Sequence, residues 1–184
     1  MQMTAKPDSD RFQSGADKYA AYLETPEGRL RCGLAFANLQ DSLVLPQSRR
    51  SLRGLDLGCG TGATAVRLAR LGIGMTLLDS PSAMLDIAKR TAREAGVDGR
   101  IALNHGDAAQ VANLFPAGSF DVVLCHNILE YVDDPVAVSR GAVRAMRDSS
   151  AILSVIVGNQ PGEVLKAAIQ AGDLAAAEQK LGAQ

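Results

Sequence analysis

Glycines and an acidic residue share the stretch LDLGCGTGATA, residues 55–65, which is the part of the chain best suited to holding a ligand. Gly58 and Gly60 lack a Cβ atom, so the backbone can bend sharply there and approach a ligand closely. Read as Gly58-x-Gly60-x-x-Ala63, the stretch fits the fingerprint of a loop that binds the pyrophosphate of a dinucleotide. Asp56 favours a cationic ligand instead, because a carboxylate attracts positive charge and repels phosphate. The loop alone leaves both ligands open.

The residues that follow the loop exclude one class of ligand but do not distinguish a dinucleotide from a cationic ligand. A nucleoside triphosphate loop would need the pattern GxxxxGK[ST], and the first basic residue after the loop is Arg67. Asp79 lies about 20 residues further on, where an acidic residue binds ribose hydroxyls in dinucleotide-binding proteins. Its two oxygens match the adjacent 2′ and 3′ hydroxyls of a ribose. Asp79 or the following Ser80 could instead cap the next helix.

More polar residues stand where later strands are expected to end. Asp107 and Ala108 follow the third predicted strand and His126 ends the fourth, and ligands in open α/β sheets bind beyond such strand ends. A plain Asx turn at Asp107 and a structural histidine are the alternatives. Glu130 and Tyr131 could face an acceptor molecule, with Glu130 as a base, or belong to the start of the next helix. No residue is singled out as catalytic.

The elements that must position these residues alternate between short apolar runs and amphipathic segments. Continuous apolar strands joined by helices indicate parallel pairing with right-handed crossovers. We therefore expect an α/β fold, Rossmann-like and doubly wound, with a mainly parallel sheet of at least five strands preceded by helices. The predicted strands are 54–58, 74–79, 101–106, 120–126 and 151–158, and the predicted helices between them are 63–71, 81–95 and 135–146, with a polar connection before the fourth strand.

The flanking segments suggest how the chain is organised. Residues 1–10 are polar and predict a disordered leader. Two helices are expected within residues 11–45, with Pro26 opening the second. Residues 161–184 are rich in alanine and predict a helical tail or lid that breaks near its Ala-Gly-Asp sequence. Residues 11–160 would then form one ligand-binding domain.

Composition sets the broad class of the protein. A chain of 184 residues with 47% apolar content can fill one core, and its net charge of −1 neither supports nor excludes nucleic-acid binding. No segment approaches the roughly 20 apolar residues of a membrane span, and the start lacks the apolar core of a signal peptide, so we expect a cytoplasmic location. Cys32, Cys59 and Cys125 form no CxxC or His-paired arrangement, which predicts neither a disulfide framework nor a metal site.

Four segments in order, LDLGCGTG, DSPSAMLDIAKR, HGDAAQV and FDVVLCHNILEYVDDP, resemble the class I S-adenosylmethionine-dependent methyltransferases over roughly residues 50–158. The resemblance implies in-line transfer of a methyl group to a small molecule or a tRNA base, a reaction that requires no metal and no covalent intermediate. Such enzymes usually end with an antiparallel strand pair that this sequence does not supply. This indicates either a truncated chain or a short member whose open sheet edge would be covered by a homodimer partner or by the tail. The implied contacts to S-adenosylmethionine are Asp56, Gly58, Cys59, Gly60, Asp79, Ser80, Asp107, Ala108 and His126.

The flanks TPEGRLRCGLAFANL, CHNILEYVDDP and GNQPGEVLKAAIQAGDL are similar to the bacterial tRNA 5-carboxymethoxyuridine methyltransferases and their relatives. In that family an arginine of the N-terminal helix reaches the cofactor, which implies Arg31 here, paired with the methionine carboxylate. A solvated helix face explains Arg29 and Arg31 equally well. The turn MRDSSA before the last strand departs from the Pro-Gly-Gly turn of most relatives. An NAD-linked oxidoreductase and a cofactor-binding but inactive protein that acts through partners are the competing functions.

Overall fold

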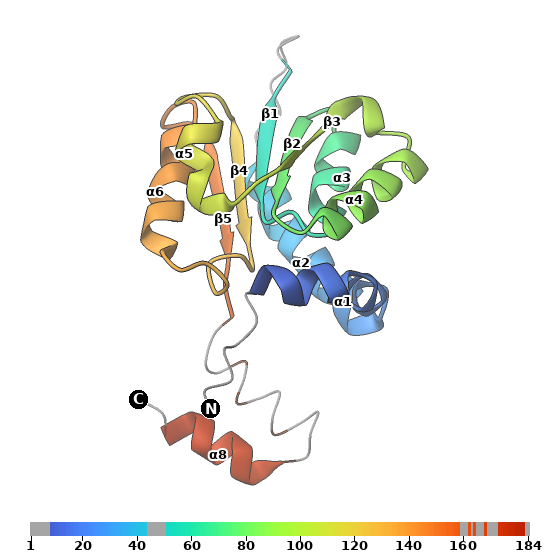
Figure 1. Ribbon diagram of the computed structural model, residues 1–184, viewed down its shortest axis with the longest axis vertical. Coiled ribbons are helices and arrows are strands. Elements are labelled where there is room, and N and C mark those ends of the chain that lie inside the picture. The colour runs from blue at the N-terminus through green and yellow to red at the C-terminus, as the bar shows by residue number, and fades with distance from the viewer. Residues whose placement is uncertain are drawn as a thin grey trace.

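The computed structural model describes residues 8–43, 51–158 and 173–182, together with the single positions 162, 164 and 168. Two helices, α1 (Asp8–Leu23) and α2 (Pro26–Ser42), precede the sheet (Figure 1). Helix α1 begins before the predicted start, so residues 8–10 are helical, and the rest of the predicted leader lies outside the described residues.

The start of α2 follows from two residues. Pro26 occupies the first helical turn, where its missing N–H leaves no hydrogen bond unmade. Thr25 is the N-cap, and its Oγ1 accepts a hydrogen bond from the Gly28 amide at 3.1 Å. The predicted break between the two helices is therefore confirmed.

A five-stranded sheet with the order β3-β2-β1-β4-β5 forms the centre of the domain, and its four strand pairings are all parallel. The predicted doubly wound α/β fold is confirmed, with boundaries one or two residues from those expected. The strands are β1 (Arg53–Leu57), β2 (Gly74–Asp79), β3 (Ile101–His105), β4 (Val122–His126) and β5 (Ile152–Ile156), and the helices between them are α3 (Ala63–Arg70), α4 (Ser82–Glu94) and α6 (Pro135–Ala145), with a short 3₁₀ turn η1 (Asp98–Arg100) before β3.

Alternating side chains of the strands build a core on each face of the sheet. On β4, Val122 and Leu124 pack on the side of α3 and α4, whereas Val123 and Cys125 pack on the side of α6. Figure 1 shows α3 and α4 at one side of the sheet and α5 and α6 at the other. Two buried faces explain why the strands appear in the sequence as continuous apolar runs.

The connection before β4 is more regular than predicted. It contains a 3₁₀ turn, η2 (Ala108–Gln110), and a one-turn helix, α5 (Val111–Leu114). A helix this short shows no detectable periodicity, which is why the sequence indicated only a polar connection. In the tail, α8 (Leu174–Gly182) follows Asp173, whose Oδ1 accepts from the Ala176 amide at 2.9 Å. The other residues of the predicted tail lie outside the described part, apart from single positions.

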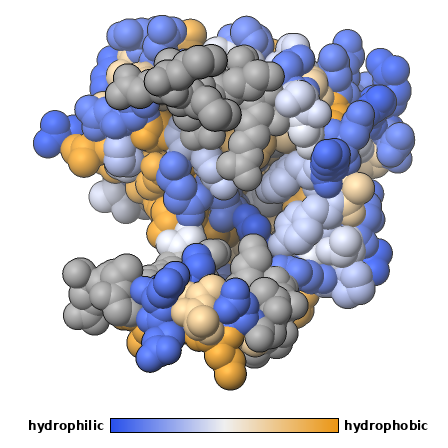
Figure 2. Space-filling view, turned by 60° about the horizontal axis from the view of Figure 1, so that its bottom comes forward, coloured by the Kyte–Doolittle hydropathy of each residue, from blue (hydrophilic) through white to orange (hydrophobic). Residues whose placement is uncertain are grey.

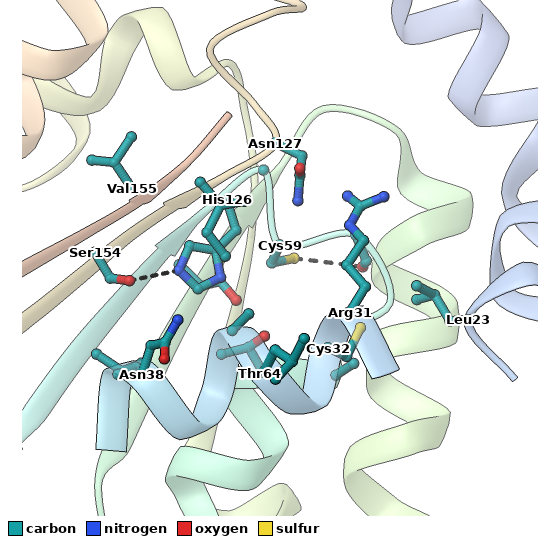
Figure 3. Close-up of a pocket in the computed structure, with 18 of the residues that line it drawn as sticks. Leu23, Arg31, Cys32, Asn38, Cys59, Thr64, His126, Asn127, Ser154 and Val155 are labelled. Atoms are coloured by element: carbon teal, nitrogen blue, oxygen red, sulfur yellow. Dashed lines mark hydrogen bonds between the residues drawn. The ribbon is translucent and has the colours of Figure 1, made fainter. Parts of the chain in front are cut away.

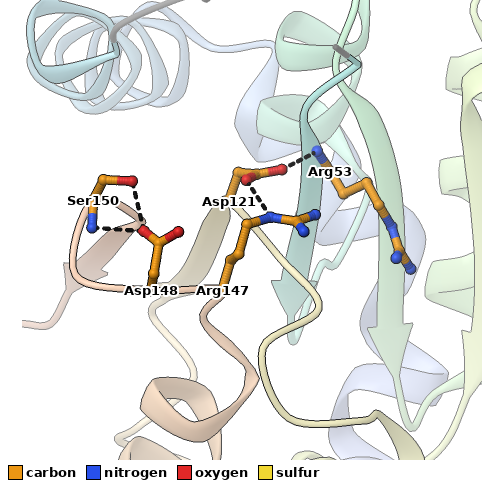
Figure 4. A network of polar contacts seen from close by, with 5 residues as sticks. All are labelled: Arg53, Asp121, Arg147, Asp148 and Ser150. Carbon is orange, nitrogen blue, oxygen red and sulfur yellow. Dashed lines mark hydrogen bonds and ion pairs between the residues drawn. The ribbon is translucent and has the colours of Figure 1, made fainter.

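The turn before β5 contains no glycine and is held by side chains instead (Figure 4). Asp148 Oδ1 accepts from the amide and the hydroxyl of Ser150, at 2.8 and 2.6 Å. The neighbouring Arg147 donates Nε–H to Asp121 at 2.8 Å, and Asp121 also accepts from the Arg53 amide at 2.9 Å. An Asx turn and an ion pair thus replace the glycine turn expected of relatives.

Strand β5 is the last strand of the sheet on its side, and the described residues supply no antiparallel strand beside it. Within the same part of the chain, no helix combines the length and the apolar character needed to cross a bilayer.

Candidate functional site

The glycine loop connects β1 to α3 at the carboxyl end of the sheet. Gly58, Gly60 and Gly62 have φ angles of +64°, +52° and +73°, which L-residues with side chains rarely adopt. A Cβ atom on Gly58 would also lie 2.5 Å from the Ile128 side chain. Glycine is therefore required at position 58 by both conformation and space.

The amides of this loop donate inward. Those of Gly58 and Cys59 donate to the carbonyl oxygen of Leu78 at 2.9 and 3.2 Å, and that of Gly62 donates to Cys59 at 2.9 Å. The Gly60 amide donates to Asp79 Oδ2 at 2.6 Å. A pyrophosphate site needs amides that point at the ligand, and these four amides donate to groups of the protein instead.

Asp79 ends β2 with its carboxylate fixed by two backbone amides. Oδ2 accepts from Gly60, and Oδ1 accepts from the Ser80 amide at 2.9 Å. A carboxylate offers about four acceptor positions, so two remain for hydroxyl groups of a ligand. Burial raises the pKa of Asp79, and the Gly60 and Ser80 amides oppose that rise.

Neither Asp79 nor Ser80 caps the following helix, which corrects one alternative from the sequence. The N-cap of α4 is Pro81, and it makes no side-chain capping bond. Gln13 of α1 supplies an acceptor instead, because its Oε1 accepts from the Ala83 amide at 3.3 Å. Asp79 is therefore left to face the cavity.

Asp56 lies next to this site and is only 4% exposed. Burial and the nearby charge of Asp79 raise the pKa of Asp56 to about 8. Burial also raises the pKa of the Cys59 thiol well above its usual value, so the thiol stays protonated. Asp56 and Asp79 both have raised pKa values, and a bound cation would favour their charged forms. A ligand with a sulfonium or an ammonium group supplies such a cation.

Two cavities meet at the glycine loop. The larger, about 650 Å³, lies between α2, the loop and β5 and is lined by Arg31, Asp56 and Cys59 among others (Figure 3). The smaller, about 340 Å³, lies between α1 and the ends of β2, β3 and β4. An elongated ligand could cross from one to the other, because both share Tyr19, Gly58, Gly60, His126 and Asn127.

The smaller cavity brings together Asp79, Ser80, Asp107 and Ala108, as the sequence predicted. Asp107 forms the Asx turn named as its alternative, since its Oδ1 accepts from the Ala109 amide at 2.8 Å. The turn and the cavity lining are compatible, because the carboxylate has a second oxygen.

His126 lines both cavities and forms a hydrogen bond with a residue that sequence reasoning missed. Its Nε2 lies 2.8 Å from Ser154 Oγ of the neighbouring strand β5 (Figure 3). Burial lowers the pKa of His126 to about 4, so the ring is neutral at physiological pH. Nothing in the sequence pairs these residues, which are 28 positions apart. The register of β4 and β5 pairs Ser154 with Leu124 and so brings Ser154 next to His126.

The N-terminal helices contribute Arg31 and a group of aromatic rings. Arg31 of α2 lines the larger cavity, and although burial opposes its charge, a hydrogen bond with Tyr22 and the nearby Tyr19 raise its pKa. Phe12 of α1 lies edge-on to Tyr19 and to Tyr131, with ring centroids 6.4 and 5.0 Å apart. The sequence predicted a helix here, but only the structure places its aromatic side chains beside the site.

Glu130 and Tyr131 lie in the loop between β4 and α6, so the alternative that they begin the next helix is wrong. Helix α6 begins at Pro135, where Asp134 accepts from the Ala137 amide at 2.8 Å. Glu130 lines neither cavity, and its carboxylate accepts from the Gly158 amide. Tyr131 lines the smaller cavity with its ring against Phe12.

The sheet order, the glycine loop and the acidic strand ends define a class I S-adenosylmethionine-dependent methyltransferase domain. A family model described as a methyltransferase domain matches residues 55–153, so the chain belongs to that family. Because the chain belongs to this family, the alternative that it is an NAD-linked oxidoreductase is wrong.

Named relatives agree with this assignment. The chain is 31% identical over 152 residues to the tRNA 5-carboxymethoxyuridine methyltransferase of Escherichia coli (strain K12), covering 82% of this chain and 57% of the relative. It is 31% identical over 121 residues to the ubiquinone biosynthesis O-methyltransferase of Xanthomonas axonopodis pv. citri (strain 306), covering 65% and 48%. The chain thus spans about half the length of the curated relatives it matches.

A solved structure shares the fold. The S-adenosylmethionine-dependent methyltransferase from Thiobacillus denitrificans, in complex with S-adenosyl-L-homocysteine, aligns with a TM-score of 0.53 and 27% identity. The alignment covers 70% of this chain and 47% of that one.

Proposed function

We propose that this domain binds S-adenosylmethionine and transfers its methyl group to a small molecule or to a tRNA base. The observation that carries the proposal is Asp79, which lines the smaller cavity with its carboxylate fixed by the Gly60 and Ser80 amides. Its remaining acceptor positions suit two ribose hydroxyls, and the loop amides are turned away from a phosphate. Family membership supports the same cofactor.

The proposed contacts divide between the cavities. In the smaller cavity, Asp79 and Ser80 would hold the ribose, and Asp107 and Ala108 would contact the adenine edge. In the larger, Arg31 would pair with the carboxylate of the methionine part of the cofactor. The backbone at Gly58, Cys59 and Gly60 would pass close to the ligand between them, with His126 opposite the loop.

The chain's own groups set the charge around the reacting atoms. When bound, S-adenosylmethionine would supply an activated methyl group, with S-adenosylhomocysteine as the leaving group and any acceptor proton released to solvent. Asp56, when ionised, stabilises positive charge at the loop. His126 is neutral and therefore places no positive charge beside the sulfonium. The rings of Phe12, Tyr19 and Tyr131 line the smaller cavity and give part of its wall an apolar character. The protein's main contribution is alignment of the reactants.

Label transfer from methyl-tritiated S-adenosylmethionine tests the proposal. The protein is incubated with cell extract, which is then separated into RNA and small-molecule fractions. We expect label in one fraction with wild-type protein and background label with Asp79→Asn. Tight binding of S-adenosylhomocysteine without label in either fraction would favour the inactive, partner-dependent alternative. Binding of NADH with no binding of S-adenosylhomocysteine would refute the cofactor assignment.

A further inference from the structure

Part of the wall of the larger cavity is apolar. Helix α2 contributes Leu34 and Ala35, and the edge strand β5 contributes Ile152 and Ile156. Because side chains alternate along a strand, Ile152 and Ile156 lie on the same face of β5 as Ser154, and both are half-buried. Figure 2 looks toward the carboxyl ends of the strands, where hydrophobic and hydrophilic surfaces lie side by side. An apolar wall inside a cavity suits the apolar part of a small-molecule ligand.

The polar groups beside this apolar wall carry little charge. His126 and Ser154 form their hydrogen bond there, Asn38 and Asn127 also line the space, and the glycine loop borders it (Figure 3). A group placed beside His126 can exchange hydrogen bonds with a neutral ring nitrogen, a hydroxyl and two amides.

The charges around the cavity argue against RNA as its occupant. Among the described residues that line it, Arg31 is the single cation, and Glu27 and Asp56 are acidic. Nucleic-acid sites gain most of their affinity from several lysines and arginines that neutralise phosphates. A volume of about 650 Å³ lies within the usual range for small-molecule pockets, roughly 300–1,000 Å³.

We propose that the part of the larger cavity between α2 and β5 binds an uncharged small-molecule acceptor with an apolar body, which lies against Leu34 and Ile156 and directs its nucleophilic group toward His126 and Ser154. The inference rests on the proposed function, because it places the acceptor at the end of the cavity that the cofactor leaves free. It assigns Ser154 a positioning role and Leu34 a role in specificity.

The experiment measures binding of 2-naphthol, a neutral molecule with an apolar body and one hydroxyl group, by calorimetry in the presence of saturating S-adenosylhomocysteine. We expect saturable binding to the wild-type protein. Leu34→Asp should weaken it at least tenfold, because it places a charge on the apolar wall, and Ser154→Ala should weaken it about threefold to tenfold. Leu34→Asp should not alter the Kd of S-adenosylhomocysteine more than twofold, and circular dichroism spectra like that of the wild-type protein show that both variants fold.

Val143→Asp is the matched control. Val143 lies on helix α6, is 56% exposed and lines neither cavity, so the same charge placed there should leave both affinities unchanged. Retained S-adenosylhomocysteine binding without 2-naphthol binding would overturn the acceptor inference alone. Loss of S-adenosylhomocysteine binding by the wild-type protein would refute the proposed function instead.

Two competing occupants are tested in the same series. Tight binding of a tRNA anticodon hairpin that Leu34→Asp abolishes, with no binding of 2-naphthol, would assign the wall to RNA and overturn the inference. Sedimentation that shows a wild-type dimer and a Leu34→Asp monomer, with 2-naphthol again not bound, would assign it to a second copy.

Discussion

The Asp79 carboxylate holds the Gly60 amide at 2.6 Å and thereby joins the end of β2 to the glycine loop after β1. One residue thus fixes the loop and presents its remaining acceptor positions to the cavity. Both tasks depend on a charged oxygen, because hydrogen bonds to charged groups are stronger than those between neutral groups.

Asp79→Asn should weaken binding of S-adenosylhomocysteine about 10- to 100-fold, the range given by loss of charge-assisted hydrogen bonds worth about 1.5–3 kcal/mol. The asparagine oxygen can still accept from Gly60, so the fold should persist. Calorimetry measures the change, with Asp86→Asn on the exposed face of α4 as the control. An unchanged Kd in Asp79→Asn would remove the proposed ribose contact.

Because the pKa of Asp56 is raised, we expect cofactor affinity to depend on pH. Its pKa is raised to about 8 in the free protein, and a bound sulfonium or ammonium group favours the ionised form. Affinity for S-adenosylmethionine should therefore rise from pH 6 to pH 8 relative to Asp56→Asn, with release of a proton on binding. Calorimetry in buffers of different ionisation enthalpy measures that proton. Identical pH profiles in the two proteins would contradict the prediction.

The raised pKa of Asp56 also determines how the stability of the free protein should change with pH. Its pKa rises from 3.8 to about 8 on folding, so folding favours the protonated form, and stability falls as pH rises between those values. His126 acts in the opposite direction, because its pKa falls from 6.5 to about 4 and stability is lost as pH drops through that interval. Urea unfolding across pH should show a weaker loss toward pH 8 in Asp56→Asn. A wild-type slope in that variant would argue against the raised pKa.

Gly58→Ala should lower the free energy of unfolding by about 1–3 kcal/mol, the usual range for a residue held in a strained conformation. The new Cβ would meet Ile128, so the loop would shift and S-adenosylhomocysteine binding should weaken as well. Gly33→Ala within α2 is the control, since its Cβ would enter open space and an alanine favours a helix. Equal stability of the two variants would show that position 58 tolerates a side chain.

Asp121→Ala tests a contact far along the strands from the cavities. Asp121 is 8% exposed and binds both Arg147 and the Arg53 amide at the amino ends of β4 and β1 (Figure 4). Leaving these donors without their acceptor should lower unfolding free energy by about 1–3 kcal/mol. The Kd of S-adenosylhomocysteine should stay within twofold of the wild-type value. A large loss of affinity would mean that this turn is coupled to the cavity.

Much of the fold could be predicted from local sequence patterns. Apolar runs marked the strands because parallel strands covered on both faces need apolar residues at every position, as β4 shows. Pro26 marked the start of α2, and the spacing of Gly58 and Gly60 marked the tight turn. Helix α5 was missed because one helical turn has no period to detect.

Only the tertiary structure decided how the ligand-binding groups are arranged. The sequence placed Asp56, the glycines and Asp79 in order, and the segments that resemble S-adenosylmethionine-dependent methyltransferases indicated the cofactor. The direction of the loop amides and the proximity of the two carboxylates arose only on folding, since charges and hydrogen bonds act through space between neighbouring strand ends. The pair formed by His126 and Ser154 arose in the same way, from register between β4 and β5. Local propensity fixes the elements, whereas electrostatics and hydrogen bonding depend on distances that only folding sets.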